Sequence, residues 1–378
     1  MTGTATAQRL GAAIKHADAH CATADEFLAA IYEQVRKVVP FDGGLWFGVD
    51  PSTLLAAPPG RLEHLEASLC QRFWDIEFRS NDVTPFRDLA RRPGPVASLR
   101  VATEDKPIRS PRYRDIMRPL GYEEEARIAF RTGTTTWAVA ALYRDRGRPA
   151  FDQDELRLLA SISQTVGVAM RARSVSPGSR AAEALLAPGV LLLDANGMLM
   201  SANVHAKAWL RQLFGLDLGE QPWSSGSGGP ALLQAWTFLH ALASQARAVM
   251  LGYEDGPARL RCRDRDGRWV MLHASCMDDG NPDSPIAIVI EPAQSGEIAP
   301  IMLDAYGLTA REREVLGGIA RGLSTPEIAA ELFLSSHTVR DYIKSVFEKV
   351  GVSSRGELTA KLFAEHYFDA FKSRLVQA

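Results

Sequence analysis

The sequence predicts a multidomain chain in which two α+β segments precede an all-α segment of four helices. Two stretches rich in Pro, Gly and Ser, at residues 173–180 and 292–300, interrupt the periodic sequence. Both predict linkers, because they offer too little apolar side chain to offset the cost of ordering. Short apolar runs with hairpin turns fill the first two segments, whereas the last segment has helical periodicity and repeated capping signals. A chain of 378 residues is long enough for two or three domains.

Composition narrows the class of protein. The chain is 46% hydrophobic and 23% charged, as is typical of a soluble globular protein. No apolar run approaches the roughly 20 residues that span a bilayer, and the N-terminal residues lack a secretory signal pattern. The scattered cysteines argue against a zinc site or a disulfide framework and fit a reducing compartment: Cys21, Cys70, Cys262 and Cys276. We therefore expect a cytoplasmic protein without a membrane partner, a metal or a cofactor.

The first segment mixes helical and strand patterns. Helices are predicted over residues 7–20, 25–38, 61–78 and 152–173, the last with Asp152 as its cap. Strands are predicted over 43–50, 126–132 and 134–144. The stretch 141–171 has a strand ending in Tyr-Arg, a short turn, a Phe-Asp start and a closing helix, and it resembles a GAF domain. The resemblance implies a GAF-like small-molecule sensor over residues 1–173, including the N-terminal helices.

The second segment begins with a hairpin. Apolar residues at 190–194 and 198–201 flank an Ala-Asn-Gly turn, which is a strong hairpin signal. A helix is predicted over 204–214, and three more strands follow within 259–279 and 284–292. This order resembles a PAS domain, which we assign to residues 182–293.

Residues 304–366 combine four helical patterns with explicit N-terminal caps. Thr309 with Glu312 and Ser324 with Glu327 each form a capping-box pattern. Pro326 lies in the first turn of the second helix, predicted over 326–333, where its missing N–H costs little. The third helix is predicted over 337–350, and a Ser-x-x-Glu pattern at 354–357 caps the fourth. Two short helices joined by a tight turn predict a helix-turn-helix.

The third helix has two contrasting faces. One side of the helical wheel is apolar, and the opposite side carries His337, Arg340, Asp341, Lys344 and Glu348. Arg and Lys can donate to guanine in the major groove, and Asp can accept from cytosine. On an isolated helix this would be a solvated face, but the tight turn and the preceding capped helix favour DNA recognition. Because the net charge is −2, binding must come from a small local surface.

The C-terminal segment closely resembles the LuxR-type (NarL/FixJ-like) DNA-binding domain. The likeness rests on LTAREREVL at 308–316, then Gly322, Ser324 and the EIA at 327–329, LS-x-HTV at 334–339 and KVGVSSR-x-EL at 349–358. It implies a four-helix domain over 304–367, followed by a tail at 368–378. The third helix would enter the major groove, and the fourth would pair two protomers.

The resemblance also implies roles for individual residues. Those placed toward bases are Arg340, Asp341 and Lys344; those near the phosphate backbone are Thr338, Lys349, Ser353, Ser354 and Arg355; those at the dimer surface are Leu358, Leu362 and His366. Tyr342 stands where the family usually has His, and Asp341 where a small or neutral side chain is common. Asp341 therefore either pairs with Lys344 or reads cytosine. With ten basic and ten acidic residues over 304–378, one copy should bind weakly, so a homodimer is expected.

The sequence says less about the signal that the first two segments sense than about DNA binding. There is no receiver-domain pattern and no phosphate-binding G-x-x-x-x-G-K-[ST] loop. A small-molecule pocket could be lined by seven aromatics, although each is more simply a core residue: Trp46, Phe73, Trp74, Phe78, Phe86, Tyr113 and Phe130. An enzyme is not expected, since a sulfoxide reductase on a GAF fold would need clustered cysteines. The sequence therefore predicts a one-component, ligand- or partner-responsive transcription regulator that binds double-stranded DNA; the alternative is a partner-regulated scaffold with vestigial DNA binding.

Overall fold

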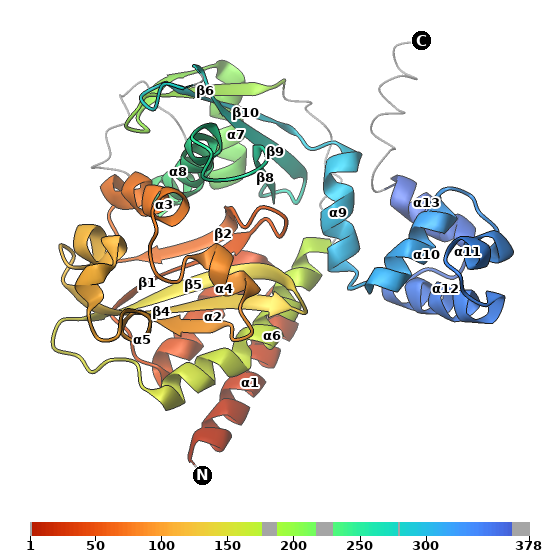
Figure 1. The fold of residues 1–378 in the computed structure, drawn as a ribbon, viewed down its shortest axis with the longest axis horizontal. Helices are drawn as coiled ribbons and strands as arrows, with labels where there is room; N and C mark the ends of the chain where they lie inside the picture. Colours follow the sequence, from red (N-terminus) through yellow and green to blue (C-terminus); the bar gives the residue numbers. More distant parts are fainter. Residues whose placement is uncertain (1, 176–186, 217–229, 279, 365–378) are drawn as a thin grey trace. The chain divides into compact units, whose positions relative to one another are not determined.

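The computed structural model describes residues 2–175, 187–216, 230–278 and 280–364. The chain divides into two compact units, Met1–Pro292 and Ala293–Ala378. The first unit contains two antiparallel sheets with their helices, and the described part of the second is entirely helical (Figure 1). None of the described helices is both long and apolar enough to cross a bilayer.

The first sheet has the strand order β2-β1-β5-β4-β3. Every residue of β1 is buried, because helices cover both faces of the sheet. The strands are β1 (Gly43–Val49), β2 (Ala56–Glu63), β3 (Val96–Ser98), β4 (Tyr122–Thr132) and β5 (Thr135–Asp145).

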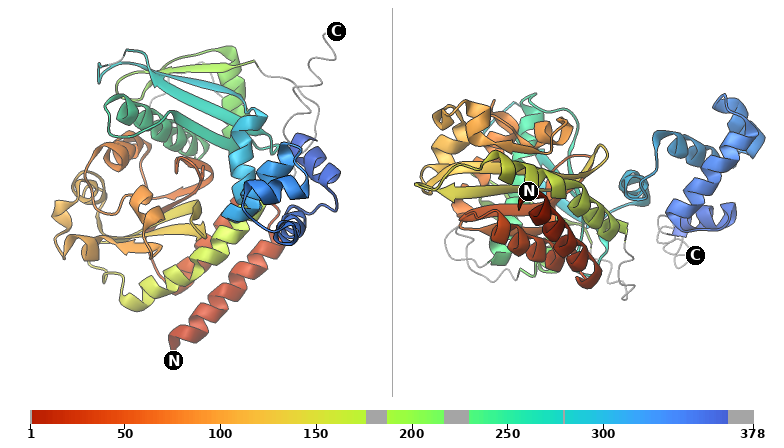
Figure 2. Two further views of the ribbon diagram at one scale, coloured as in Figure 1. Left: turned by 45° about the vertical axis from the view of Figure 1, so that its right-hand side comes forward. Right: turned by 90° about the horizontal axis from the view of Figure 1, so that it is seen from below.

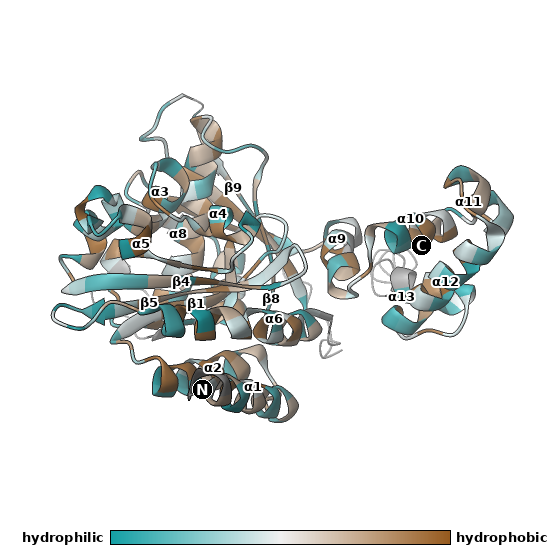
Figure 3. Cartoon of the chain, turned by 60° about the horizontal axis from the view of Figure 1, so that its bottom comes forward, coloured by the Kyte–Doolittle hydropathy of each residue, from teal (hydrophilic) through white to brown (hydrophobic). Residues whose placement is uncertain are grey.

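Alternating side chains of β1 show how the helices are distributed. Trp46 points to Tyr32 of α2, with ring centroids 5.8 Å apart, whereas Phe47 points to Trp74 of α3 at 5.6 Å. The N-terminal helices and the long α6 therefore lie on one face, and the shorter helices on the other (Figure 3). The first group is α1 (Thr2–His20), α2 (Ala24–Val38) and α6 (Gln153–Val175); the second includes α3 (Cys70–Arg79), α4 (Phe86–Arg91) and α5 (Leu99–Thr103), with the short turns η1 (Ala67–Leu69), η2 (Pro107–Arg109) and η3 (Tyr113–Met117) in the same stretch of chain.

The second sheet repeats the topology of the first. Its order is β7-β6-β10-β9-β8, so within each sheet the strands follow the order 2-1-5-4-3. The strands are β6 (Gly189–Leu193), β7 (Leu199–Ala202), β8 (Ala258–Arg263), β9 (Trp269–Cys276) and β10 (Ile286–Pro292), and the helices are α7 (Val204–Phe214) and α8 (Pro230–Met250).

The two sheets of this unit share one continuous core. Helix α8 packs on β8 and β9 of its own sheet and also on α3 and β2 of the first, and the left view of Figure 2 shows this helix between the two sheets. Polar contacts reinforce the packing: Gln71 Nε2 donates to the Ala195 carbonyl at 3.1 Å, and Ser244 Oγ donates to Asp75 at 2.9 Å. The predicted first linker begins inside α6, which extends to Val175, and residues 176–186 lie outside the described part.

Two sequence predictions are wrong here. The helix expected over 61–78 begins only at Cys70, because Arg61–Glu63 pair with β1 as the end of β2. The linker expected over 292–300 instead contains the start of α9 (Ser295–Ala305). A capping box between Gln294 and Glu297 starts this helix, and it buries four apolar side chains at helical spacing: Ile298, Ile301, Met302 and Ala305.

The rest of the second unit contains the four predicted helices. They are α10 (Ala310–Ala320), α11 (Thr325–Glu331), α12 (Ser336–Val350) and α13 (Arg355–Ala364). Their core consists of Leu308, Val315, Leu316, Ile319, Ile328, Ala329, Val339, Ile343, Val346, Val350 and Leu358. Helices α10 and α11 approach closely at Gly318, where an added Cβ would lie 2.7 Å from Ile328 Cγ1.

Candidate nucleic-acid interface

Helices α11 and α12 form a helix-turn-helix whose boundaries are set by local caps. Ser324 and Glu327 form a reciprocal capping box at the start of α11, and Thr309 and Glu312 do the same for α10. Ser335 Oγ accepts from the Thr338 N–H at 3.1 Å and starts α12. Only residues 332–334 lie between the end of α11 and this cap. The predicted caps and the tight turn are thus confirmed.

Helix α12 presents the predicted polar face to solvent. Its four apolar residues Val339, Ile343, Val346 and Val350 are buried, while His337, Arg340, Asp341, Lys344 and Glu348 are exposed. Asp341 lies 3.1 Å from Nδ1 of His337, one turn earlier, and not beside Lys344 as one reading of the sequence proposed. Within the described part of the chain, Lys344 has no hydrogen bond or ion pair. The face therefore offers two cations, Arg340 and Lys344, to an outside partner.

The residues predicted near phosphates all have partners inside the unit. Lys349 Nζ donates to both oxygens of Glu312, at 2.8 and 2.7 Å. Arg355 donates to the Leu323 carbonyl and to Thr325 Oγ1. Ser353 and Ser354 hydrogen-bond to Glu357 at the start of α13, and the Thr338 hydroxyl lies 2.9 Å from Ser335 Oγ. The contacts of Lys349 and Arg355 join different helices, whereas the others are local to the starts of α12 and α13, and phosphate binding by the same side chains stays a prediction.

Glu312 is a buried carboxylate that contacts the N-cap of α10 and residues of α12. Its burial raises the pKa, but hydrogen bonds from Lys349, Ser345 and Thr309 outweigh burial and lower the pKa of Glu312 to about 2. The carboxylate thereby joins the N-terminus of α10 to α12. The recognition helix is held by this ionic contact as well as by apolar packing.

The predicted dimer residues occupy different situations. Leu358 is fully buried in the unit's own core, so its side chain does not lie on an open surface. Leu362 belongs to α13, but its side chain lies outside the described part, as do His366 and the tail at 368–378. Tyr342, the departure from the family pattern, packs half-buried against the core.

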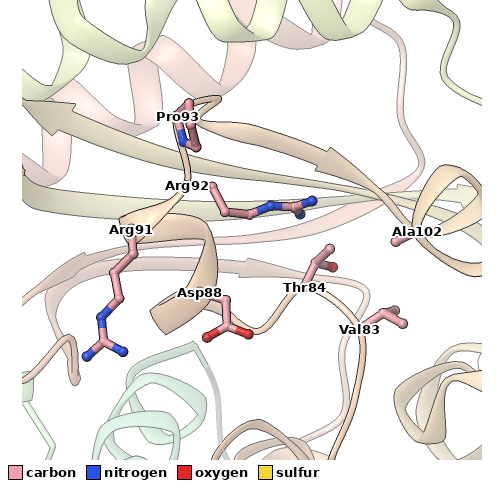
Figure 4. Close-up of a pocket in the computed structure, with 7 residues that line it drawn as sticks. All are labelled: Val83, Thr84, Asp88, Arg91, Arg92, Pro93 and Ala102. Carbon is pink, nitrogen blue, oxygen red and sulfur yellow. The ribbon is translucent and has the colours of Figure 1, made fainter.

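The seven aromatics suggested for a ligand pocket are all core residues, divided between the two faces of the first sheet. Trp46 stacks on Phe130 at 5.3 Å on the α2 face. Phe73, Trp74, Phe78 and Phe86 pack on the other face, and the buried Tyr113 donates to Glu123 at 3.1 Å. The structure does contain an open groove of about 670 Å³ near α4 and α5, but none of the seven lines it (Figure 4). Its lining residues are Val83, Thr84, Asp88, Arg91, Arg92, Pro93 and Ala102.

A buried ionic network that the sequence pattern does not predict lies beneath this groove. Arg127 bridges Glu77 and Glu125, at 2.8 and 3.1 Å, and Arg112 bridges Glu125 and Asp82, at 2.8 and 2.7 Å. Burial raises the pKa of Glu125, but the two arginines outweigh it, and the net shift is downward. The same arginines donate to the Val83 and Thr84 carbonyls, and Val83 and Thr84 line the groove. The signal in the sequence was the charged run EEEAR at 123–127, which directly precedes the apolar residues of the same strand β4.

The geometry of the second unit defines a helix-turn-helix domain. Residues 307–362 match the family model described as "Bacterial regulatory proteins, luxR family". The spore germination protein GerE of Bacillus subtilis is 44% identical over 55 residues, which are 15% of this chain and 74% of GerE. The chain therefore belongs to the luxR family of bacterial regulatory proteins.

Other similar proteins match over smaller shares of their own length. A probable transcriptional regulatory protein NarL of Mycobacterium tuberculosis is 40% identical over 76 residues, 20% of this chain and 32% of NarL. The transcriptional regulatory protein UhpA of Escherichia coli is 34% identical over 132 residues, 33% of this chain and 65% of UhpA. The chain thus spans about a third of NarL. A crystal structure of the phage VqmA–DPO complex also matches. The match covers 48% of this chain and 84% of the VqmA chain, with 19% sequence identity and a TM-score of 0.26.

Proposed function

We propose that this protein is a sequence-specific transcription regulator that inserts α12 into the major groove of double-stranded DNA. The observation that carries the proposal is the exposed face of α12, where Arg340 and Lys344 lie opposite a buried apolar stripe. A capped turn presents that face, as in helix-turn-helix domains whose second helix reads base edges. Membership in the luxR family supports the same function.

Within this proposal the residues divide by role. Arg340, Lys344 and Asp341 read bases. The side chains that donate to the DNA phosphate backbone are those of Thr338, Lys349, Ser353, Ser354 and Arg355. The domain binds as a homodimer through α13, with Leu362 and His366 in the contact and Leu358 supporting the helix from the core. Two copies are required because the C-terminal region has balanced charge.

The first unit would act as the signal-receiving part. We assign residues 1–173 to a GAF-like domain and 182–293 to a PAS-like domain, supported by the strand order 2-1-5-4-3 in both sheets. A small molecule or a protein partner would shift the regulator between two arrangements only if it binds one more tightly than the other. The groove of Figure 4 is a candidate surface for such a ligand, and Arg92 extends across it toward Thr84 and Ala102. We place this one-component regulator in the cytoplasm, where its DNA target is accessible.

The test is selection of a binding sequence from random duplexes by the full-length protein, followed by titration of the selected site. The wild type should select a defined sequence, and the double variant Arg340→Ala/Lys344→Ala should lose it. A matched control is Arg311→Ala, which removes the same type of charge from an exposed pair with Glu314 on α10. If the wild type selects no sequence, or the double variant binds like the control, the alternative of a partner-regulated scaffold with vestigial DNA binding is favoured.

A further inference from the structure

Phe333 occupies an unfavourable position in the turn of the helix-turn-helix. Phe333 is 95% exposed, more than any other large apolar residue in the described part of the chain. Its backbone is left-handed, with φ of 56°. L-residues with a side chain rarely adopt this region, and exposure forfeits the gain that burying a ring would provide. Both features disfavour Phe at this position.

The neighbouring helices of the same unit show what this position normally requires. Helices α10 and α12 also end in left-handed residues, and there the chain has Gly322, with φ of 82°, and Gly351, with φ of 71°. Glycine is the usual residue at such helix ends because it has no Cβ to clash. The turn at Phe333 is closed in a similar way, with the Leu334 N–H donating to the Ala329 carbonyl at 2.9 Å. Phe333 is therefore the exception, because the left-handed residues that follow α9, α10 and α12 in this unit are all glycine.

Contacts within the unit do not account for this exception. Phe333 is absent from the apolar core and from the residues packed against it, and no ring contact involves it in the described part of the chain. It is also the sole strongly exposed large apolar residue among the described residues of the second unit, and the leucines on either side, Leu332 and Leu334, pack against the core. An apolar protein groove would ordinarily meet a larger patch than one ring.

The surroundings of Phe333 fit nucleic acid better. Phe333 lies two residues before Ser335, the N-cap of α12. Hydroxyl side chains follow at Ser335, Ser336 and Thr338. Hydroxyls and the first N–H groups of a helix suit phosphate oxygens, whereas a ring suits a thymine methyl group or a deoxyribose. The N-terminal end of the second helix is also the part that reaches base edges in this class of domain.

We propose that Phe333 is a DNA-contacting residue whose ring packs on an apolar part of the duplex at the edge of the site read by α12. This inference rests on the proposed function of α12. It adds an apolar contact to a face that otherwise offers charged and hydroxyl groups. It also explains why the chain has Phe where the comparable positions after α9, α10 and α12 have Gly.

The test compares Phe333→Gly, Phe333→Asn and Phe333→Leu in the full-length protein, on the sequence selected by the wild type. The Gly and Asn variants fit the left-handed backbone, so their melting temperatures should equal or exceed that of the wild type. Their dissociation constants should nevertheless rise about tenfold, equivalent to about 1.4 kcal/mol. Phe333→Leu keeps an apolar side chain and should lose less. The salt dependence of binding should stay the same, because no charge is removed.

A uracil scan locates the contact. Replacing thymine by uracil removes one methyl group at a time; a loss seen with the wild type but not with Phe333→Gly identifies a thymine contact. A tenfold loss on every site variant, without such a position, identifies a sugar contact. If Phe333→Gly binds as tightly as the wild type while Arg340→Ala does not, this inference is overturned and the proposed function stands. If the wild type selects no sequence, both are overturned.

Discussion

Arg261 of β8 donates three hydrogen bonds to Asp50, which directly follows β1. The Arg261 N–H and Nε reach one carboxylate oxygen at 3.0 and 2.8 Å, and Nη2 reaches the other at 2.8 Å. The side chains are 10% and 0% exposed, respectively. The two residues belong to different sheets of the first unit, so this contact fixes one sheet against the other.

Arg261→Met should destabilise the first unit by about 3–5 kcal/mol, because it leaves a buried carboxylate without its cation. The measurement is urea unfolding of the full-length protein, followed by tryptophan fluorescence. Since the two sheets share one core, the transition of this unit should shift as a whole rather than split.

The control is Glu33→Gln, which removes the partner of Arg61 from a largely exposed pair. It should cost less than about 1 kcal/mol. Equal effects of the two variants would mean that the Asp50 contact does not hold the sheets together.

The contact between Glu312 and Lys349 predicts acid sensitivity of the second unit. The pKa of Glu312 is lowered to about 2, so its stabilising effect is complete above the ordinary glutamate pKa. That effect is then lost as pH falls from about 4.5 toward 2, because protons bind the unfolded state more readily. Glu312→Gln should cost about 2 kcal/mol at pH 7 and make stability less dependent on pH in this window.

Thermal unfolding monitored by circular dichroism at pH 7, 4 and 2.5 checks this, with Glu314→Gln, an exposed residue of the same helix, as control. The difference between Glu312→Gln and the wild type should shrink toward pH 2. A constant difference over this range would contradict the ionic role of Glu312.

Local signals explain why the second unit was predictable. The caps at Thr309 and Ser324 involve residues three apart, and the stripe from Val339 to Val350 follows one helical period, so both are visible in a short stretch of sequence. The end of α11 was less visible: the predicted helix over 326–333 ends at Glu331, since Leu332 caps it and Phe333 adopts a left-handed backbone.

Long-range packing explains what was missed in the first unit. Residues 235–248 of α8 are all buried, and a helix buried on every side lacks the single apolar stripe that reveals an amphipathic helix. Strand β2 depends on pairing with β1, and the bridge between Arg112 and Asp82 spans 30 residues. No local pattern encodes such partners. The simpler interpretation of the seven aromatics, that they are core residues, is confirmed.

Single substitutions on α12 should separate recognition from stability. Arg340→Ala and Lys344→Ala should each weaken binding to the selected site by about 1–3 kcal/mol. Both side chains are exposed, so the melting temperature should stay within about 1–2 °C of the wild type. Fluorescence anisotropy on the selected and on a scrambled duplex checks this. Unchanged affinity for the selected site in both variants would rule out this face as the reading surface.

Lys349→Met distinguishes a structural lysine from a phosphate-binding one. Because Lys349 pairs with Glu312, the variant should lower the melting temperature, as Lys344→Ala should not. If Lys349 also contacts phosphate, the slope of log affinity against log salt should fall by about one for each copy bound. An unchanged slope with a lowered melting temperature would limit Lys349 to holding α10 against α12.

Substitutions of two leucines of α13 should affect different properties, folding stability for Leu358 and DNA binding for Leu362. Leu358 is fully buried, so Leu358→Ala should destabilise the second unit by about 2–5 kcal/mol. If α13 pairs two protomers as proposed, Leu362→Asp should weaken binding to a duplex with two half-sites more than to one with a single half-site. Titrations of both duplexes, together with sedimentation of the DNA complexes, measure this difference. Equal losses on the two duplexes would exclude α13 as the dimer contact, and DNA binding would then depend on pairing elsewhere in the chain.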